Sequence, residues 1–560
     1  MELTTLDLVV FLAFMGMVVA VSLYAGRREG SSEDYFLAGR SLGWGLIGFS
    51  LIASNISTEH FVGMAGQAFG RVGLAIASYE WMSAIVLVFV AWWLLPRFLS
   101  AGIYTMPEYL EYRYDAGART IMAVFMMVAY VIVFLATVLF SGAVALDAVF
   151  DLTGMFQLRF GMAPEDAQFW AMVSGIWVIG IIAGCYTIYG GLKAVVWSDL
   201  LQGAALLIGG SVVAVLGLQL LGDGSLVAGW SEFRTVNADK LHVVLPWNDP
   251  DVPWLAVFVG GLWIPNLFYW GLNQFITQRT LGAKSLAEGQ KGVLFAACLK
   301  LLIPFIIVMP GIMAYQLYGD SISNGDMAYP HMMGQVLPPY LRGAMFAALC
   351  GAVMSSFNSG INSASTIFTI DLYKRFLNRD ADAAQEVRVG RIATGVIVVI
   401  ACLWAPVISG FEGVFNYIQE IWGFISPAIV AVFLVGLLAR RTPALAARGA
   451  LWLGIPLYAL CRVPKWVLDG VFGWDERQPG AAGNGLLEAL YAFNSWSFLH
   501  HMGLVFVVLV IFMVIVTRWR PLAEPRVMPV SRIDVTPHPK QYLFGGAVIA
   551  MTVALYVLFW

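Results

Sequence analysis

The chain has 560 residues, of which 60% are hydrophobic and only 12% are charged. Soluble domains carry about 25% charged residues, so this composition excludes a soluble globular protein and predicts an all-α, polytopic membrane protein. The formal net charge of −3 gives no indication of a nucleic-acid partner.

Fourteen apolar stretches reach the roughly 20 residues that a membrane-spanning helix requires. The first does not resemble a cleavable signal peptide, because acidic Glu2 and Asp7 stand where such a peptide carries Lys or Arg. We therefore expect an uncleaved helix within residues 1–30. The predicted spans lie near 6–25, 42–66, 73–96, 120–148, 168–190, 194–221, 254–276, 289–316, 340–373, 389–409, 413–438, 443–463, 497–517 and 541–559.

The distribution of basic residues orients these spans. If the first connection, 26–41, is cytoplasmic, 23 of the 32 Lys and Arg fall on the cytoplasmic side, eight on the outer side and one, Lys300, within a span. The loop 222–253, which is then outside, carries five acidic residues. This asymmetry follows the positive-inside rule and predicts that both termini are outside. The short loops suit a bacterial inner membrane.

Motifs of ATP-driven and catalytic proteins are missing from the chain. The segment GGLWIPNLFYWGL (260–272) contains glycines but not the GxxxxGK[ST] pattern of a phosphate-binding loop. The sequence also shows neither a metal-binding cluster nor a nucleophile–base pair. We therefore expect no ATP, no organic cofactor and no enzymatic activity, and any pumping must draw on another energy source.

Ionisable residues inside the predicted spans are candidates for a functional site, because an unpaired charge in a membrane is costly. Lys300 lies in the middle of GVLFAACLKLLIPF (292–305), where the side chain would have to reach far to meet water. Asp199, eight residues after Gly191, also fits a position at the inner interface. The complete set is Glu59, His60, Glu80, Asp199, Lys300 and Glu420.

Two clusters of small polar side chains interrupt the apolar spans. The stretch SNIST (54–58) in the second span suits a broken helix that lines a cavity better than a helix that faces lipid. Unwinding there would free carbonyl oxygens that could bind Na+ together with the hydroxyls of Ser355 and Ser356 in the ninth span. Taken alone, these two serines also fit close helix packing or bonding to the preceding turn.

A third group of segments combines amides or carboxylates with aromatic rings. These are SYEWMS (78–83), NLFYWGLNQF (266–275) and FNYIQE (415–420). Sugars are bound by planar polar groups that meet their hydroxyls and by a ring that covers their apolar face. Aromatic residues at the ends of spans also form interface belts, but Glu80, Asn266 and Gln419 beside the rings favour a sugar site.

These residues stand in motifs that resemble the sodium/solute symporters, particularly the sodium/sugar cotransporter branch with its bacterial sodium/galactose carriers. The resemblance implies a leucine-transporter-like core of two inverted repeats of five helices, at 42–221 and 254–438, separated by the outer loop 222–253 and followed by three peripheral helices within 443–560. It also implies that each repeat begins with a broken helix, and Pro265, which lacks an N–H, favours a break within IPNLFYW (264–270). The motifs that carry it are EDYFLAGRSL (33–42), GLAIASYEWMSAI (73–85), IYGGLKAVVWSD (188–199), QRTLGAKS (278–285), TIFTIDLYKRF (366–376) and the terminal YVLFW.

The resemblance also implies a role for individual residues. A Na+ site falls on the backbone carbonyls of Ala53, Ile56 and Ala352 and the hydroxyls of Ser355 and Ser356. The sugar site falls on Asn55, His60, Glu80, Ser83, Asn266, Lys300 and Gln419. Tyr269 resembles an inner gate beneath the sugar, and Met64, Tyr79 and Phe415 resemble an outer lid.

Two departures from the family pattern affect the details. The bacterial galactose carriers have Gln at the position of His60, where the animal glucose carriers have His, so the hexose is left open between galactose and glucose. Family members that bind a second Na+ use an acid like Asp199 with hydroxyls one turn further along the ninth span. Ser359 fits that pattern, whereas Asn358 and Ala352 do not. This favours one Na+ for each sugar.

The function predicted from the sequence is Na+-coupled import of a neutral monosaccharide by alternating access, with Na+, the sugar and the lipid bilayer as partners. One alternative is a cyclitol or sialic acid carried by the same fold. A second alternative is an uncoupled sugar sensor or leak channel, which the intact Na+-site pattern at SNIST, Ser355 and Ser356 disfavours. The sequence makes no prediction of the oligomeric state.

Overall fold

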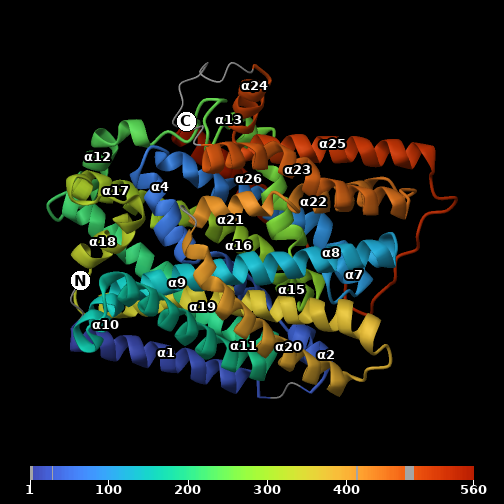
Figure 1. Cartoon of the computed structure of the whole chain (residues 1–560), viewed down its shortest axis with the longest axis horizontal. Helices are drawn as coiled ribbons and strands as arrows, with labels where there is room; N and C mark the ends of the chain where they lie inside the picture. The colour runs from blue at the N-terminus through green and yellow to red at the C-terminus, as the bar shows by residue number, and fades with distance from the viewer. Residues whose placement is uncertain (1–3, 28–29, 411–413, 473–484) are drawn as a thin grey trace.

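Long apolar helices run side by side along the longest axis of the molecule, with α1 along one edge and α25 and α26 near the opposite one (Figure 1). The computed structural model describes residues 4–27, 30–410, 414–472 and 485–560. Across these ranges no β-strand forms beyond two isolated bridges, so the all-α prediction is confirmed.

The fourteen predicted spans all correspond to helices of the structure. Eleven described helices are long and apolar enough to cross a membrane. One of them, α11, runs over 58 residues and accounts for two predicted spans, because it is kinked at Gly191. The φ of Gly191 is 50°, which lies in the left-handed region that glycine tolerates. The second and eleventh spans are divided into shorter helices, including Trp44–Asn55 and Ser426–Leu438.

The helices have the following bounds. The N-terminal half contains α1 (Thr5–Ala25), α2 (Ser32–Leu37), α3 (Trp44–Asn55), α4 (Ala65–Phe69), α5 (Ser78–Phe89), α6 (Leu95–Ala101), α7 (Met106–Arg113), α8 (Ala116–Val128), α9 (Leu135–Phe150), α10 (Leu152–Phe160), α11 (Pro164–Leu221) and α12 (Leu226–Val236). The C-terminal half contains α13 (Trp254–Phe258), α14 (Trp263–Leu267), α15 (Gln274–Leu281), α16 (Leu286–Ile306), α17 (Val308–Tyr318), α18 (Ala328–Val336), α19 (Leu341–Ile367), α20 (Ala383–Trp404), α21 (Val414–Trp422), α22 (Ser426–Leu438), α23 (Ala444–Phe472), α24 (Gly485–Asn494), α25 (Phe498–Trp519) and α26 (Gln541–Leu558).

Five described segments adopt the wider π-helical turn, which occurs mostly as short insertions near functional sites. One of them, η2, follows the break in the second span, and another, η7, precedes the break in the seventh. The five are η2 (Glu59–Met64), η4 (Val90–Leu94), η5 (Ala129–Phe134), η7 (Phe268–Leu272) and η10 (Phe368–Leu377).

The first helix of each predicted repeat is broken, as the sequence suggests. In the second span α3 ends at Asn55 and the backbone is extended at Ile56, with ψ of 114°. In the seventh span the extended residue is Asn273, with ψ of 124°, immediately before α15. The expected break at Pro265 is eight residues too early. Pro265 instead lies in the first turn of α14, where a missing N–H does no harm.

Close helix contacts hold the broken helices against the rest of the bundle. Gly203 of α11 lies against α3, and a Cβ added there would be only 2.9 Å from the Cβ of Ala53. Glycine therefore lets α11 approach the break of α3 closely. This contact brings Asp199, one turn earlier on α11, next to the serines of α3.

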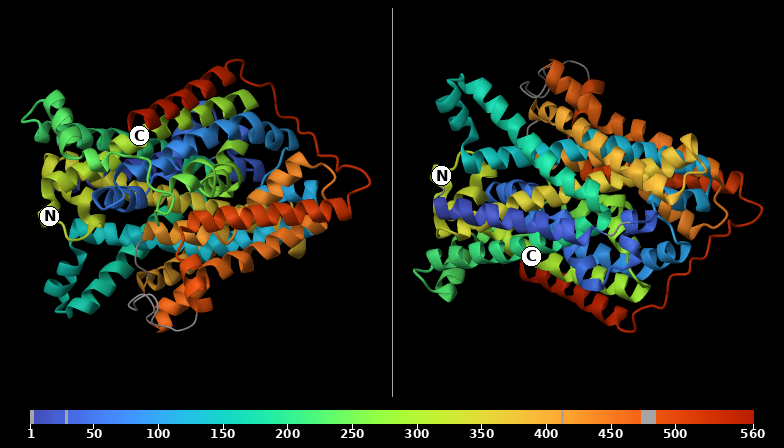
Figure 2. Two further views of the ribbon diagram at one scale, coloured as in Figure 1. Left: turned by 90° about the horizontal axis from the view of Figure 1, so that it is seen from above. Right: turned by 90° about the horizontal axis from the view of Figure 1, so that it is seen from below.

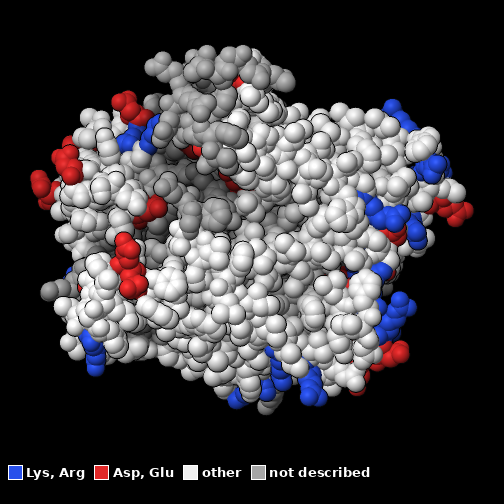
Figure 3. Space-filling view, viewed as in Figure 1, with Lys and Arg blue, Asp and Glu red and all other residues white. Residues whose placement is uncertain are grey.

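On the face drawn in Figure 3, most charged side chains gather at the two ends and few lie between them. Lys and Arg predominate at one end and Asp and Glu at the other, the pattern predicted from the positive-inside rule. At the basic end the segment 520–540 crosses from α25 to α26 on the other side of the bundle (Figure 2). Ser531 N donates to the carbonyl of Ser100, and Leu286 N donates to the carbonyl of Asp534.

Candidate functional site

A cavity in the middle of the bundle contains all seven residues predicted to bind the solute. It lies between α3, η2, α5, α14, η7, α16 and α21, so both broken helices form part of its wall. Its lining residues are Ser54, Asn55, Ser57, Glu59, His60, Tyr79, Glu80, Ser83, Phe134, Pro265, Asn266, Phe268, Tyr269, Trp270, Lys300, Ser356, Ile418, Gln419 and Trp422.

Lys300 forms the centre of the polar wall. Only 1% of its surface is exposed, and its Nζ donates to the carboxylate of Glu80 and to Oδ1 of Asn55. His60 Nε2 lies 3.6 Å from the other Glu80 oxygen. The Nζ also lies 4.9 Å from the centre of the Trp270 ring, a distance at which a cation–π contact is favourable. The lysine charge is therefore balanced from within the protein.

Amides and hydroxyls complete the wall. Asn55 Nδ2 donates to the hydroxyl of Tyr269 at 3.1 Å, and Ser83 Oγ donates to Oδ1 of Asn266 at 2.8 Å. Among the described residues, Asn266 Nδ2 and Glu59 Oε1 are buried without a hydrogen-bond partner. Buried polar atoms normally find a partner, so these two groups are available to a bound molecule or to water.

The cavity is narrow in this conformation. Its volume is about 60 Å³, which is room for a few water molecules, since one water needs about 10–15 Å³ on this measure. A solute the size of a hexose would therefore have to displace the direct contacts between the walls, such as that between Asn55 and Tyr269. Asn55 and Tyr269, which narrow the cavity by bonding to each other, also carry hydrogen-bonding groups that face it.

The predicted gates are distributed unevenly around this cavity. Tyr269 and Tyr79 both line it. Met64 is fully buried at the end of η2 and lies beyond the lining residues. The side chain of Phe415 lies outside the described part of the structure.

Among the residues predicted to bind Na+, Ser356 of α19 contacts the end of α3, next to the helix break. Ser356 Oγ donates to the backbone carbonyl of Ser54 at 3.1 Å. The N–H of Ser57 points at His60 Nδ1, at 3.4 Å, instead of continuing the helix to the carbonyl of Ala53. Carbonyl oxygens at a helix end that lack intrahelical partners can bind a cation. The helix break thus leaves the carbonyl of Ala53, the residue before Ser54, without its helical donor.

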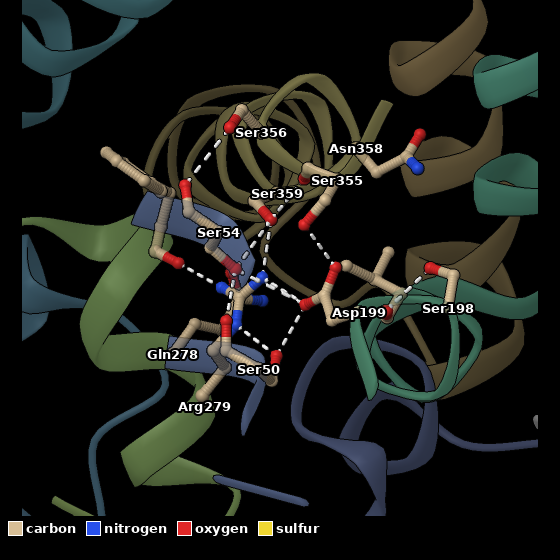
Figure 4. Close-up of polar contacts among 12 residues, drawn as sticks. Ser50, Ser54, Ser198, Asp199, Gln278, Arg279, Ser355, Ser356, Asn358 and Ser359 are labelled. Atoms are coloured by element: carbon tan, nitrogen blue, oxygen red, sulfur yellow. Dashed lines mark hydrogen bonds and ion pairs between the residues drawn. The ribbon is translucent and has the colours of Figure 1, made fainter. Parts of the chain in front are cut away.

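Asp199 and Ser359, the predicted second cation position, lie in a polar cluster next to Ser355 (Figure 4). Asp199 is fully buried, so the interfacial interpretation of this residue is wrong. Its Oδ1 accepts a hydrogen bond from Ser355, and its Oδ2 accepts from Ser50 and, at 3.3 Å, from Ser54. Arg279 of α15 reaches into the same cluster, and its Nη2 lies 2.8 Å from Asp199 Oδ2.

Comparisons with known proteins identify the family. The model of the sodium:solute symporter family matches residues 35–456. The chain is 42% identical over 465 residues to a sodium/glucose cotransporter of Vibrio parahaemolyticus. The aligned region covers 79% of this chain and 82% of that protein. The chain belongs to the sodium:solute symporter family.

Two further comparisons describe the breadth of the likeness. The symporter is 33% identical over 501 residues to the sodium/myo-inositol cotransporter 2 of Sus scrofa, with 83% of this chain and 70% of that protein covered. Among solved structures, a substrate-bound, outward-open Na+-coupled sialic acid symporter has a TM-score of 0.70 at 20% identity and covers 94% of this chain and 100% of that chain. This second likeness shows a shared leucine-transporter-like fold.

Family membership confirms the coarse functional prediction. The protein is a multi-pass membrane protein and a Na+-coupled solute symporter, with Na+ as its co-transported ion, and its relatives are transporters and not enzymes. The seven residues predicted for the solute site line one cavity, and their role in binding stays a prediction.

The sequence assigns no functional role to two residues that the structure places in or beside the site, Glu59 and Arg279. The sequence marks Glu59 as an ionisable residue in a span but gives it no role, and the structure shows that it lines the cavity. The sequence places Arg279 among the cytoplasmic charges, because this residue lies in the connection after the seventh predicted span, five residues before Lys284. The structure corrects this, since Arg279 is 1% exposed and lies within the bundle.

Proposed function

We propose that this symporter imports a neutral monosaccharide of the glucose or galactose type together with Na+, by alternating access. The observation that carries the proposal is the balanced polar wall of the central cavity. Lys300 is neutralised by Glu80 and is held by Asn55, so the wall offers a set of donors and acceptors in which this positive charge is already paired. Such a set fits the hydroxyls of a sugar, and Trp270, Phe268 and Tyr269 supply rings for its apolar face.

A carboxylate-bearing solute such as sialic acid fits this wall less well. Its anion would need a cation, but Lys300 already pairs with Glu80, and Glu59 adds a further acid to the lining. Placing an anion beside two carboxylates in a buried site costs electrostatic energy. A cyclitol is a neutral polyol and meets the same wall without this penalty, so myo-inositol is the second candidate, and a relative that is 33% identical is named as its cotransporter.

Na+ is proposed to bind at the carbonyls of Ala53, Ile56 and Ala352 with the hydroxyls of Ser355 and Ser356. An ion there would join α3 to α19 directly beside Asn55 and would favour the cavity shape that binds the sugar. Coupling of this kind is reciprocal, so the sugar would also tighten Na+ binding. The membrane potential adds about 2.3 kcal/mol per charge for each 100 mV. The proposed location is a bacterial inner membrane with both termini outside.

Uptake into sealed proteoliposomes tests the proposal. Labelled glucose, galactose, myo-inositol and sialic acid are supplied separately, with an inward Na+ gradient or with K+ in its place. We compare the wild type with Ser356→Ala and with a matched control, Ser365→Ala. Ser365 is a buried serine of the same helix whose Oγ bonds to the carbonyl of Asn362 in the preceding turn, at 2.9 Å.

The expected result is concentrative, Na+-dependent uptake of a neutral sugar that Ser356→Ala abolishes and Ser365→Ala preserves. Preference for myo-inositol would replace the monosaccharide with a cyclitol. Preference for sialic acid would overturn the argument from the balanced wall. Equilibration without accumulation would indicate an uncoupled channel or sensor, contrary to the proposal.

A further inference from the structure

Three helices meet where α11 kinks, far from the central cavity in the chain and on the outside of the bundle. Both α1 and α20 pack against α11, and the three lie together at the lower edge of Figure 1. Two glycines form the contact with α1, since a Cβ added to Gly26 would lie 2.4 Å from the Cα of Gly190. On the side of α20, a Cβ added to Gly395 would touch Ile188 at 3.7 Å. The contacts on α11 thus fall within three residues of one another.

Four basic side chains come from the three helices around this junction. Arg27 directly follows Gly26, and Lys193 lies on α11 two residues after the kink. Arg391 donates from Nη2 to the carbonyl of Tyr189 at 3.3 Å. Lys and Arg side chains line the lower edge of the molecule in this region (Figure 3). The basic patch consists of Arg27 of α1, Lys193 of α11, and Arg388 and Arg391, one turn apart on α20.

The basic patch lacks the acidic partners that other cations of the same side have. Arg40 pairs with Glu33, and Lys374 pairs with Glu386. Within the described ranges, none of the four patch residues forms an ion pair with a carboxylate. In addition, Nε of Arg391 is buried without a hydrogen-bond partner. Buried polar atoms normally find a partner, so the patch offers both positive charge and a free donor to an anion.

The surface next to the basic patch is apolar and belongs to the membrane-spanning part of the helices. Ile392 and Val396 of α20 are exposed directly beyond Arg391. The rings of Tyr24 and Tyr189 are exposed beside the patch, as is typical of aromatic residues at a membrane interface. An anion with apolar tails can contact both surfaces at once, whereas a free phosphate ion can use only the basic one.

We infer that the junction of α1, α11 and α20 binds the headgroup of an anionic phospholipid, from the leaflet on the side of the membrane where Lys and Arg predominate. The phosphate lies among the four basic side chains and accepts a hydrogen bond from Nε of Arg391. The acyl chains lie along the exposed apolar surface of α20. Basic pockets between membrane helices are known to recognise lipid headgroups in this way. The bound lipid offsets the repulsion among the four cations and joins the three helices, whichever solute the symporter carries.

Binding of lipid to the purified full-length protein tests the inference. Phosphatidylglycerol and phosphatidylcholine with the same acyl chains are titrated separately into delipidated protein in a neutral detergent, and bound lipids are counted by native mass spectrometry. Each cation near an anionic surface strengthens binding by roughly fivefold, so the first phosphatidylglycerol should bind at least about tenfold more tightly than the first phosphatidylcholine. Equal binding of the two lipids would overturn the inference.

Removal of charge locates the site. The double variant Arg388→Gln with Arg391→Gln should weaken binding of the first phosphatidylglycerol by roughly 25-fold and leave phosphatidylcholine unaffected. A matched control is Arg518→Gln with Arg520→Gln, which removes two exposed arginines at the end of α25, near the opposite edge of the bundle. The control should bind lipid as the wild type does. Equal losses in both double variants would show a general attraction to basic surfaces and would overturn the inference.

Melting temperatures distinguish a lipid site from a site for free phosphate. Phosphatidylglycerol should raise the melting temperature of the wild type more than that of the patch variant, because binding stabilises the folded state. Inorganic phosphate at the same concentration should have no such effect, and an equal rise would overturn the assignment to a lipid. If the patch variant does not fold, Arg27→Gln with Arg388→Gln takes its place, since both residues are exposed. Unchanged lipid binding in that variant would overturn the inference.

Discussion

The symporter contains two buried cation–carboxylate pairs that differ in what surrounds them. Lys300 and Glu80 face the central cavity, where amide groups and unpartnered polar atoms lie within the same lining. Arg279 and Asp199 are enclosed by hydroxyls and a backbone carbonyl from α3, α15 and α19. Both pairs are buried, but only the first pair borders the central cavity.

The residue types follow this difference. The ammonium of Lys300 is a compact charge with three donors on a flexible stem, so it can exchange one partner for a sugar hydroxyl. The guanidinium of Arg279 has its donors in a rigid plane. Each described neighbour that it contacts accepts a hydrogen bond from it. On the proposed function we expect the first pair to exchange partners during transport, whereas the second should change only when whole helices move.

The strongest way to break the enclosed pair is Asp199→Asn, which leaves Arg279 buried without a carboxylate. Removing one partner of a buried ion pair typically costs about 3–5 kcal/mol, and no Na+ can compensate for the loss because the charge left behind is positive. We expect a fall of that size in the apparent free energy of unfolding, measured by denaturant titration of the purified protein. An unchanged free energy, or recovery on adding Na+, would contradict the enclosed-pair interpretation.

Lys300→Met tests the pair that faces the cavity. Glu80 is then left unpaired, but the cavity admits water, so the loss of stability should be smaller than for Asp199→Asn. Hydrogen bonds to charged groups contribute about 1.5–3 kcal/mol, so the apparent affinity for the solute should fall by roughly 10- to 100-fold. Lys291→Met on the same helix, whose lysine pairs with Glu288 and is partly exposed, is the control and should keep the wild-type affinity. Equal losses in both variants would exclude a specific role for Lys300.

Tyr269→Phe sharpens the description of the cavity wall. It removes the single hydroxyl that accepts from Asn55 Nδ2 at 3.1 Å and keeps the ring. A neutral hydrogen bond contributes about 0.5–1.5 kcal/mol, so the KM for uptake should change by roughly two- to tenfold while the protein folds normally. A complete loss of uptake would mean that the hydroxyl does more than bond to Asn55.

The smallest effect is expected from an ion pair at the surface, outside the spans. Arg71 bonds to Asp249 and Asp251, and its side chain is 55% exposed. Exposed pairs contribute about 0–1 kcal/mol. Arg71→Ala should therefore shift the melting temperature at neutral pH by a few degrees at most.

The pH dependence of that surface pair has a definite sign. Burial raises the pKa of Asp249, but its hydrogen bond with Arg71 and those from two backbone N–H groups outweigh this and hold the pKa below its ordinary value of 3.8. The contribution of Asp249 is thus fully present above pH 3.8 and is lost as the pH falls through the lowered value. Melting curves of the wild type and Arg71→Ala should converge only below about pH 4, and convergence at pH 6 would refute this.

The sequence predicted which residues line the central cavity because these residues stand out against an apolar background. Asn55, Glu80 and Lys300 each interrupt a membrane span, and polar side chains are costly enough at that depth that they usually face a cavity or a functional site. The helix count was equally accessible, because each span repeats the same length of apolar residues. The family resemblance then indicated which of these polar residues belong to the same site.

Arg279 could not be found in the same way. A basic residue near the end of a span, followed by Gly282 and Lys284, has the pattern of a cytoplasmic loop. Arg279 is buried because α15 begins inside the bundle at Gln274, after the break at Asn273. Its side chain also lies next to Asp199 of α11 in the folded protein. No local pattern encodes a contact with Asp199, which lies 80 residues earlier.

The π-helical segments make the shape of the cavity depend on chain length as well as on side chains. A π turn contains one residue more than an α turn, and each residue of an α-helix turns the chain by about 100°. Deleting one residue from η2 would therefore let an ordinary helix form and would rotate Glu59 and His60 relative to the residues beyond them. Insertions and deletions, which usually accumulate in loops, are thus a means of redirecting the lining of a transport cavity from within its helices.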